Sequence, residues 1–152
     1  MKLAALTTAG FSIAAVLFAP PASAMSLGSY TMDMPDRRDF HTWVWAMNSF
    51  CYDDAGNEVL GCYRVLTIPR PVAKADSQWA DAHLVDGQYT IALDENFGLR
   101  CGDIYYGPTQ PTHDVYTWDP NTLAGHMVST FAAGCDGAPG GSITYPFTLT
   151  RM

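Results

Sequence analysis

Basic side chains are scarce in this sequence. Eight Lys and Arg residues stand against fifteen Asp and Glu, which gives the 152 residues a net charge of −7. The one adjacent basic pair, Arg37-Arg38, is flanked by Asp36 and Asp39, a pattern that predicts a solvated turn with mutually compensating charges. Binding to a phosphate backbone requires clustered Lys and Arg. The sequence therefore argues against nucleic acid as a partner.

The sequence motifs of common hydrolases and metal sites are also missing. There is no G-x-S-x-G nucleophile elbow, no H-E-x-x-H pair and no C-x-x-C spacing. The four histidines stand apart from one another and are not assigned to a metal: His41, His83, His113 and His126. We therefore predict no catalytic residue from motifs, no cofactor and no metal site.

The amino-terminal segment has the pattern of a secretory signal peptide. Lys2 precedes an apolar run over residues 3–19, and the small-residue site Ala22-Ser23-Ala24 follows. A retained membrane anchor is the alternative, but the run is shorter than the roughly 20 apolar residues that a bilayer crossing needs. We expect cleavage after residue 24, no integral membrane segment thereafter, and one domain over residues 25–152 that is secreted or held at the cell envelope.

Export would place the four cysteines in an oxidising compartment, where they pair. Cys51 and Cys62 bracket a segment rich in Asp, Gly and Asn, which turns the chain back on itself. This favours a Cys51–Cys62 disulfide and leaves Cys101 to pair with Cys135. Four cysteines permit three pairings, and this is the one that we predict.

Between turns, apolar residues recur with a period of two, which is typical of β-strands. Asp86-Gly87 suits the positive φ values of a type I′ hairpin turn between two such strands. The expected strands are 29–33, 41–47, 62–68 (ended by Pro69 and Pro71), 79–85, 88–94, 100–106, 113–119 and 143–151. We predict an all-β fold, a single antiparallel β-barrel or β-sandwich domain of about seven to nine short strands with two disulfides.

Two interpretations are open for residues 120–133. Asp119-Pro120 suits the start of a helix, and apolar residues follow at helical spacing. Against a helix, Gly125 interrupts the run, and Val128 and Thr130 are β-branched residues that lose rotamer freedom in a helix. We favour a strand here, with Asp119 as the side chain that stabilises the preceding turn.

Three tryptophans are the candidate ligand-binding residues. Trp43 and Trp45 share one face of a strand, and with Trp79 they offer indole rings that stack on glycans or apolar ligands. Packing of these rings in the core is the alternative. The first functional hypothesis is a non-enzymatic domain that binds a small apolar or glycan ligand or a protein partner.

Two further functional hypotheses belong to other classes. A hydrolase would need an acid pair assembled by the fold, and Asp81 and Asp94 are candidates because they flank the Asp86-Gly87 hairpin. A structural or adhesive surface protein would need no binding site at all. The sequence alone does not decide between these hypotheses and a binding domain.

Several motifs resemble a group of small secreted proteins of unknown function from mycobacteria and related actinobacteria. The motifs are the segment 116–125 (YTWDPNTLAG), Cys135-Asp136-Gly137 and Phe147-Thr148-Leu149, together with the earlier Thr42-Trp43-Val44-Trp45 and Asp86-Gly87-Gln88-Tyr89. The likeness covers most of residues 25–152. It implies export, two disulfides, a β-rich domain and a role at the cell envelope or in the extracellular space, but it implies no catalytic residue. In the group a cysteine often follows the Trp-bearing strand closely, whereas residues 47–50 intervene here before Cys51.

Overall fold

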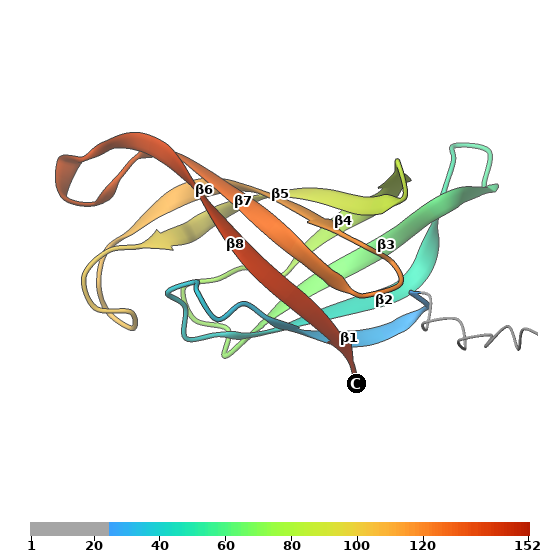
Figure 1. Cartoon of the computed structure of the whole chain (residues 1–152), viewed down its shortest axis with the longest axis horizontal. Coiled ribbons are helices and arrows are strands. Elements are labelled where there is room, and N and C mark those ends of the chain that lie inside the picture. Colours follow the sequence, from blue (N-terminus) through green and yellow to red (C-terminus); the bar gives the residue numbers. More distant parts are fainter. Residues whose placement is uncertain (1–24) are drawn as a thin grey trace, which may run out of the picture.

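The computed structural model describes residues 25–152, which form eight β-strands and one short 3₁₀ turn. In chain order these are β1 (Gly28–Asp33), β2 (Thr42–Tyr52), β3 (Glu58–Arg70), β4 (Gln78–Val85), β5 (Gln88–Arg100), β6 (Thr109–Trp118), β7 (Ala124–Ala133), η1 (Cys135–Gly137) and β8 (Pro139–Arg151). Each strand pairs antiparallel with the next, and β1 also pairs with β8, so the sheet closes into a barrel (Figure 1). The predicted antiparallel all-β domain is confirmed. The predicted signal peptide, residues 1–24, lies outside the described residues.

The two ends of the barrel differ. One end, which we call the charged end, carries the connections 34–41, 71–77, 101–108 and 134–138 (Figure 1). At the opposite end the Met25 backbone N–H donates to the Pro120 carbonyl at 2.8 Å, and the Trp118 indole donates to the Met25 sulfur at 3.1 Å. Met25 therefore packs over the opposite end of the barrel. Within residues 25–152, no helix is long and apolar enough to cross a membrane.

Inward-facing side chains change character along the barrel. Toward the opposite end they are large and apolar: Tyr30, Trp45, Met47, Tyr89, Ile91, Tyr116, Trp118, Met127 and Phe147. Gly125 lies opposite Trp118 in the β6–β7 ladder, and a Cβ there would clash with the Thr117 carbonyl oxygen and lie 2.6 Å from Trp118 Cβ, so glycine permits the close approach of β6. Toward the charged end, β5, β6 and β7 bury polar residues instead: Glu95, Thr112, Asp114 and Ser129.

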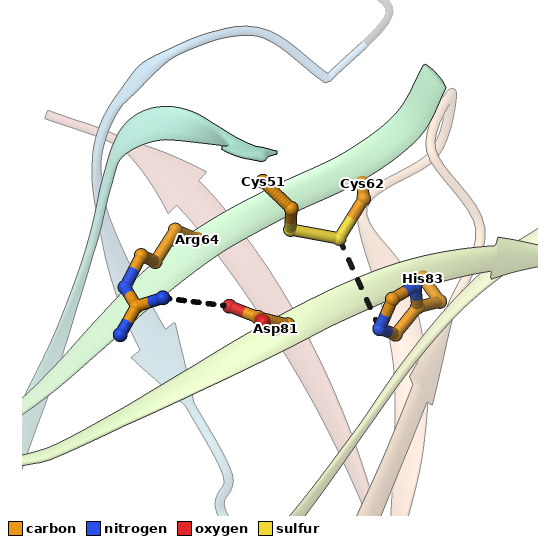
Figure 2. Close-up of a disulfide and its surroundings, with 5 residues drawn as sticks. All are labelled: Cys51, Cys62, Arg64, Asp81 and His83. Carbon is orange, nitrogen blue, oxygen red and sulfur yellow. Dashed lines mark hydrogen bonds and ion pairs between the residues drawn. A yellow bond between two sulfur atoms is a disulfide. The ribbon is translucent and has the colours of Figure 1, made fainter. Parts of the chain in front are cut away.

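Both predicted disulfides are present. Cys51–Cys62 joins β2 to β3 next to their hairpin, with the Cα atoms 5.3 Å apart and His83 of β4 alongside (Figure 2). Cys101–Cys135 joins the start of the 101–108 loop to the turn between β7 and β8, with the Cα atoms 5.4 Å apart. Two disulfides fit an oxidising, extracellular environment.

The prediction of a strand over residues 100–106 is wrong. β5 continues to Arg100, and residues 101–108 form a loop. The reason is local, because the Asp103 carboxylate accepts the backbone N–H groups of Tyr105 and Tyr106, both at 2.9 Å. Such a side-chain bond offers the backbone an alternative to a strand ladder.

Pro69 does not end its strand as expected. β3 continues to Arg70, and Pro69 lies opposite Trp43 in the β2–β3 ladder. The β3–β4 ladder already ends at Thr67, so the absent N–H of Pro69 removes no bond to β4.

The prediction of a strand within residues 120–133 is confirmed, because β7 spans Ala124–Ala133. The alternative of a helix is wrong. Asp119 stabilises the turn before β7 by accepting the backbone N–H groups of Asn121 at 2.7 Å and Thr122 at 2.8 Å.

Asp119→Ala removes both of these bonds. We expect it to lower the thermal midpoint by about 2 to 5 °C. Asp119→Asn keeps a carbonyl oxygen that can accept the same N–H groups, and it serves as the control with a midpoint near that of the wild type. Thermal unfolding followed by circular dichroism measures both variants, and equal midpoints for the alanine variant and the wild type would contradict this role of Asp119.

Candidate functional site

The 34–41 loop crosses the charged end and sends Arg37 into the barrel. The Arg37 side chain is buried, and one guanidinium nitrogen lies 3.6 Å from Asp114 on β6 and 3.4 Å from the Gly98 carbonyl on β5. A second nitrogen lies 3.8 Å from the Met127 sulfur on β7. A cation on a loop thus contacts three strands that lie far away in the sequence.

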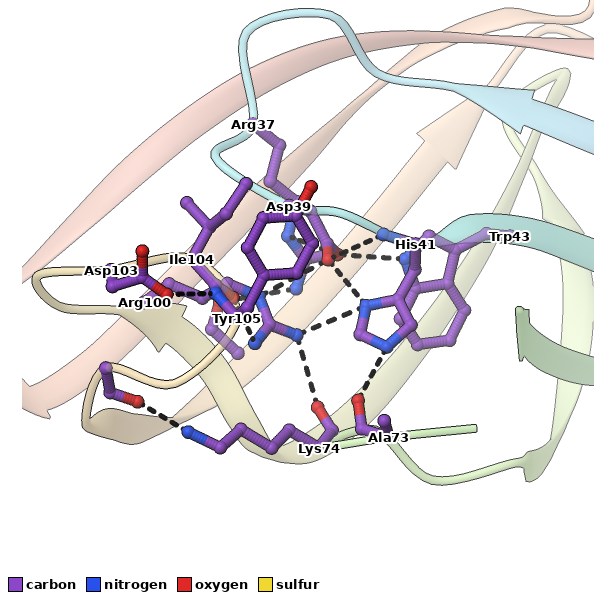
Figure 3. Close-up of polar contacts among 12 residues, drawn as sticks. Arg37, Asp39, His41, Trp43, Ala73, Lys74, Arg100, Asp103, Ile104 and Tyr105 are labelled. Atoms are coloured by element: carbon purple, nitrogen blue, oxygen red, sulfur yellow. Dashed lines mark hydrogen bonds and ion pairs between the residues drawn. The ribbon is translucent and has the colours of Figure 1, made fainter. Parts of the chain in front are cut away.

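Asp39 is the acceptor around which the rest of this end is organised (Figure 3). Its carboxylate lies 2.6 Å from His41 Nδ1, and it accepts hydrogen bonds from the Trp43 indole at 3.0 Å and from Arg100 Nε at 3.3 Å. A buried carboxylate with several donors is held in one orientation. Asp39 therefore fixes the direction of three side chains from the loop, β2 and β5.

His41 and Arg100 extend this network to the 71–77 connection. His41 Nε2 lies 2.8 Å from the Ala73 carbonyl, and Arg100 donates to the Lys74 carbonyl at 3.2 Å. The Arg100 guanidinium also lies 4.7 Å from the centroid of the Phe40 ring, a cation–π contact. These contacts hold two of the four connections at the charged end against β5 (Figure 3).

The expectation of a solvated turn at Arg37-Arg38 is wrong for Arg37 and Asp39, both of which are buried. The two side chains lie 3.8 Å apart, and Asp114 supplies a second carboxylate to Arg37. Asp114 is contributed by a distant strand, so the local sequence gave no sign that Arg37 would find a buried partner.

The electrostatic environment shifts the pKa values of two carboxyl groups in opposite directions. Burial alone would raise the pKa of Asp39, but the charge of Arg37 and the hydrogen bond from Trp43 outweigh burial and hold this pKa below its ordinary value. Burial raises the pKa of Glu95 to about 7, with Arg37 opposing the shift and Asp114 adding to it. At neutral pH, Asp39 is therefore ionised, whereas Glu95 is partly protonated.

Four inward-facing polar residues on β5–β7 form what we call the acidic wall: Glu95, Thr112, Asp114 and Ser129. Register brings them together, because Glu95 pairs with Thr112 and Asp114 pairs with Ser129. Ser129 Oγ donates to Asp114 Oδ1 at 2.6 Å. The acidic wall faces Arg37 from the strands of the barrel.

A cavity of about 510 Å³ opens where the end of β1, the 34–41 loop and the start of β2 meet. Its walls include Thr31, Met32, Asp33, Met34, Pro35, Arg37, Asp39, His41, Thr42 and Trp43. The walls thus combine ionised groups, hydroxyl groups, one indole and the apolar surface of two methionines. Such a mixture suits a small ligand with hydrogen-bonding groups.

The structure separates the three tryptophans that the sequence nominates. Trp43 lies in the cavity wall, whereas Trp45 is fully buried in the aromatic core. Trp79 is 52% exposed on the outside of β4, with the Arg64 guanidinium 5.6 Å from its ring centroid. Only Trp43 of the three is part of the charged end.

Asp81 and Asp94 do not form the acid pair that was considered. Asp81 lies 3.7 Å from Arg64 (Figure 2), and Asp94 lies 2.7 Å from His113 Nδ1. The buried acids are Asp39, Glu95 and Asp114 instead. A signal for Glu95 exists in the sequence, because it continues the inward alternation of β5, and Asp114 likewise precedes the inward Tyr116 by two residues.

Comparisons with family models, curated proteins and solved structures find no match to this chain. Among residues 25–152, no group of three or more His, Cys, Asp and Glu side chains is arranged to hold a metal ion.

Glu95→Gln is expected to change the pH dependence of stability. Between pH 4.5 and about 7 the folded protein keeps the Glu95 proton that the unfolded chain has lost, so stability falls as pH rises through this window. The variant should exceed the wild type by about 2–3 kcal/mol in free energy of unfolding above pH 7, and the difference should close below pH 4.5. Urea unfolding at a series of pH values measures it. Glu58→Gln, at the exposed second glutamate, is the control, and a pH-independent difference for Glu95→Gln contradicts the expectation.

Proposed function

We propose that the protein is an exported binding domain that holds a small polar ligand in the cavity at the charged end. The observation that carries the proposal is the cavity itself, whose wall includes the oriented polar groups of Asp39, His41 and Trp43. Preorganised polar groups around a cavity are what a specific small-molecule site requires. The oxidised cysteines support export.

A polar ligand agrees better with this arrangement than an apolar one. The apolar half of the barrel interior is filled by contacts among aromatic rings, such as Trp45 with Tyr116 at 5.1 Å and with Trp118 at 5.4 Å between centroids. The cavity instead adjoins charged side chains, whose desolvation by an apolar ligand would cost free energy. Among the ligand classes raised by the sequence, the cavity favours a glycan or another small polar molecule over a lipid.

The indole N–H signals of the tryptophans in an NMR spectrum test this proposal. The probes are neutral oligosaccharides, amino sugars, arginine and a short-chain fatty acid. Binding in the cavity should shift the Trp43 signal and leave the Trp79 signal unchanged, because Trp79 lies on the outside of β4. If no probe shifts the Trp43 signal, the proposal fails and a structural surface protein becomes the better hypothesis.

A cavity-filling variant supplies the second part of the test. Met34→Trp places a larger side chain in the wall, and we expect it to weaken any binding detected at Trp43 by at least about tenfold, which corresponds to about 1.4 kcal/mol. Val72→Trp, at an exposed position, is the matched control and should leave binding unchanged.

Hydrolysis by an acid pair is a second candidate, favoured by the opposite pKa shifts of Asp39 and Glu95. Two carboxyl groups whose pKa values are shifted apart are what hydrolases use for base and acid roles. Incubation of the protein with chromogenic glycosides tests this candidate. Turnover that Glu95→Gln abolishes would support hydrolysis, whereas binding without turnover, retained in Glu95→Gln, would support the binding domain.

A further inference from the structure

Arg37 is buried at the charged end but is held loosely. Its guanidinium lies 3.6 Å from Asp114, 3.8 Å from Asp39, 3.4 Å from the Gly98 carbonyl and 3.8 Å from the Met127 sulfur. A well-formed hydrogen bond between a guanidinium and a carboxylate is about 2.7–2.9 Å long. The carboxylates therefore neutralise the charge of Arg37, but its N–H donors lie farther from their acceptors than in a well-formed hydrogen bond.

Two acceptor oxygens of the acidic wall make no hydrogen bond within the described residues. Among residues 25–152, Asp114 Oδ2 makes no hydrogen bond, since its ion pair with Arg37 is 3.6 Å long, and the buried Thr112 Oγ1 has no hydrogen-bond partner. Both belong to residues that face the interior from β6, two positions apart. A buried polar group without a hydrogen bond destabilises the fold, so it needs an explanation. A buried carboxylate oxygen that its own cation approaches only to 3.6 Å indicates a site that a better-fitting cation would satisfy.

The acidic wall and Arg37 belong to segments that differ in how easily they open. The acidic wall lies on paired strands, while Arg37 is on a loop, and loops open at a lower cost than strands separate. The adjacent ladder is also irregular, because residues 96–98 of β5 lie opposite the single residue Pro111 of β6. Pro111 has no N–H to donate, and the Gly98 carbonyl accepts from Arg37 instead.

We propose that the acidic wall and the Gly98 carbonyl form a binding site for a guanidinium group, which Arg37 occupies when no ligand is bound. The inference rests on the proposed function, because Arg37 lines the cavity, and its displacement together with the 34–41 loop would open the acidic wall to the ligand. It assigns a guanidinium group to that ligand. A free or peptide-borne arginine side chain carries this group.

The shape of the site favours guanidinium over ammonium. The acceptors nearest to the Arg37 guanidinium, Asp114 Oδ2 and the Gly98 carbonyl, lie on two different strands, and a planar fork of five N–H donors can reach both together. The Trp43 ring centroid lies 6.0 Å from the Arg37 guanidinium carbon, within the range in which an indole attracts a cation. The net charge of −7 favours the approach of cations to the protein as a whole.

Chemical rescue of Arg37→Ala is the decisive experiment. Methylguanidinium at millimolar, non-denaturing concentrations should raise the thermal midpoint of this variant saturably, with a dissociation constant of about 1 mM or tighter. Methylammonium at equal ionic strength should be at least about tenfold weaker. The matched control is Arg64→Ala, which removes a half-exposed arginine paired with Asp81 and should not be rescued.

A second substitution, at the Asp114 carboxylate of the acidic wall, tests where the added cation binds. Asp114→Asn in the Arg37→Ala background should abolish the rescue, while Asp81→Asn in the same background should leave it intact. Absence of saturable rescue in Arg37→Ala overturns the inference, and so does rescue that survives Asp114→Asn.

Hydrogen exchange of the wild type keeps the test valid if Arg37→Ala does not fold. Saturating arginine should accelerate exchange of backbone amides in the 34–41 loop at least about tenfold, because the ligand replaces Arg37 and releases the loop. Unchanged exchange overturns displacement of Arg37. A sugar that shifts the Trp43 signal, found together with a failed rescue, overturns the guanidinium assignment alone and leaves the proposed function standing.

Discussion

Trp45→Ala is expected to lower the free energy of unfolding by about 3–5 kcal/mol. The Trp45 ring is fully buried, and its centroid lies 5.1 Å from that of Tyr116, 5.4 Å from Trp118 and 6.0 Å from Phe147. Alanine would remove the centre of this aromatic cluster and leave a cavity that the closed sheet cannot fill by collapse.

Trp79→Ala is the control for this prediction. Trp79 is exposed on β4 and contacts Arg64 on the neighbouring strand, so its loss should cost no more than about 1 kcal/mol. Urea unfolding followed by circular dichroism compares the two variants under identical conditions. Similar losses for both would show that Trp45 does not anchor the core. The comparison also separates packing from ligand contact, because the sequence nominated both residues as ligand-binding.

The features that the sequence predicted well are local. The Asp86-Gly87 turn is one of them, since both residues adopt the positive φ values, 51° and 81°, that a type I′ hairpin requires. The Cys51–Cys62 disulfide is another, because the hairpin between β2 and β3 brings the two sulfur atoms together. In each case the determining residues lie within about a dozen positions of one another, so a window of sequence contains the information.

The charged end could not be predicted in this way. Arg100 lies 61 positions from the carboxylate of Asp39 that it contacts, and Arg37 lies 90 positions from Met127. Closure of the sheet brings these residues together, and no sequence window contains them. Trp43 was found because its aromatic strand pattern is local, although the pattern did not distinguish it from the core residue Trp45.

The division of the barrel interior explains how one sequence pattern supports both stability and a site. The inward alternation of β5 runs through Tyr89, Ile91 and Leu93 before it reaches Glu95, so the strand that completes the core also delivers the acid. The apolar residues stabilise the sheet, and the buried acid costs free energy. The stability of the aromatic half permits polar groups at the charged end that would be unfavourable in isolation.

Asp39→Asn is expected to lower the free energy of unfolding near neutral pH by about 3–5 kcal/mol. The substitution keeps the shape of the side chain but removes its negative charge beside two guanidinium groups, those of Arg37 and Arg100. It also replaces one carboxylate oxygen by an N–H₂ donor, which would face either the Trp43 indole N–H or the group of donors around Oδ1. Both buried arginines would lose their shared partner.

The pH dependence gives this prediction a second, independent measurement. The pKa of Asp39 is lowered in the folded protein, because Arg37 and hydrogen bonds outweigh burial, so its ionised form stabilises the fold above its ordinary pKa of 3.8. That stabilisation is lost as pH falls below 3.8. The difference between wild type and Asp39→Asn should therefore shrink as pH falls below 3.8, while contributions from carboxylates that do not interact with Asp39 cancel between the two proteins.

Asp94→Asn is the matched control, because Asp94 also lies close to a histidine Nδ1, at 2.7 Å from His113, but its side chain is 89% exposed. An exposed pair contributes at most about 1 kcal/mol, so this variant should remain close to the wild type at every pH. Urea unfolding between pH 2.5 and 7 compares the three proteins. A loss in Asp39→Asn no greater than in Asp94→Asn would mean that Asp39 does not hold the charged end together, and the oriented cavity wall on which the proposed ligand site depends would lose its physical basis.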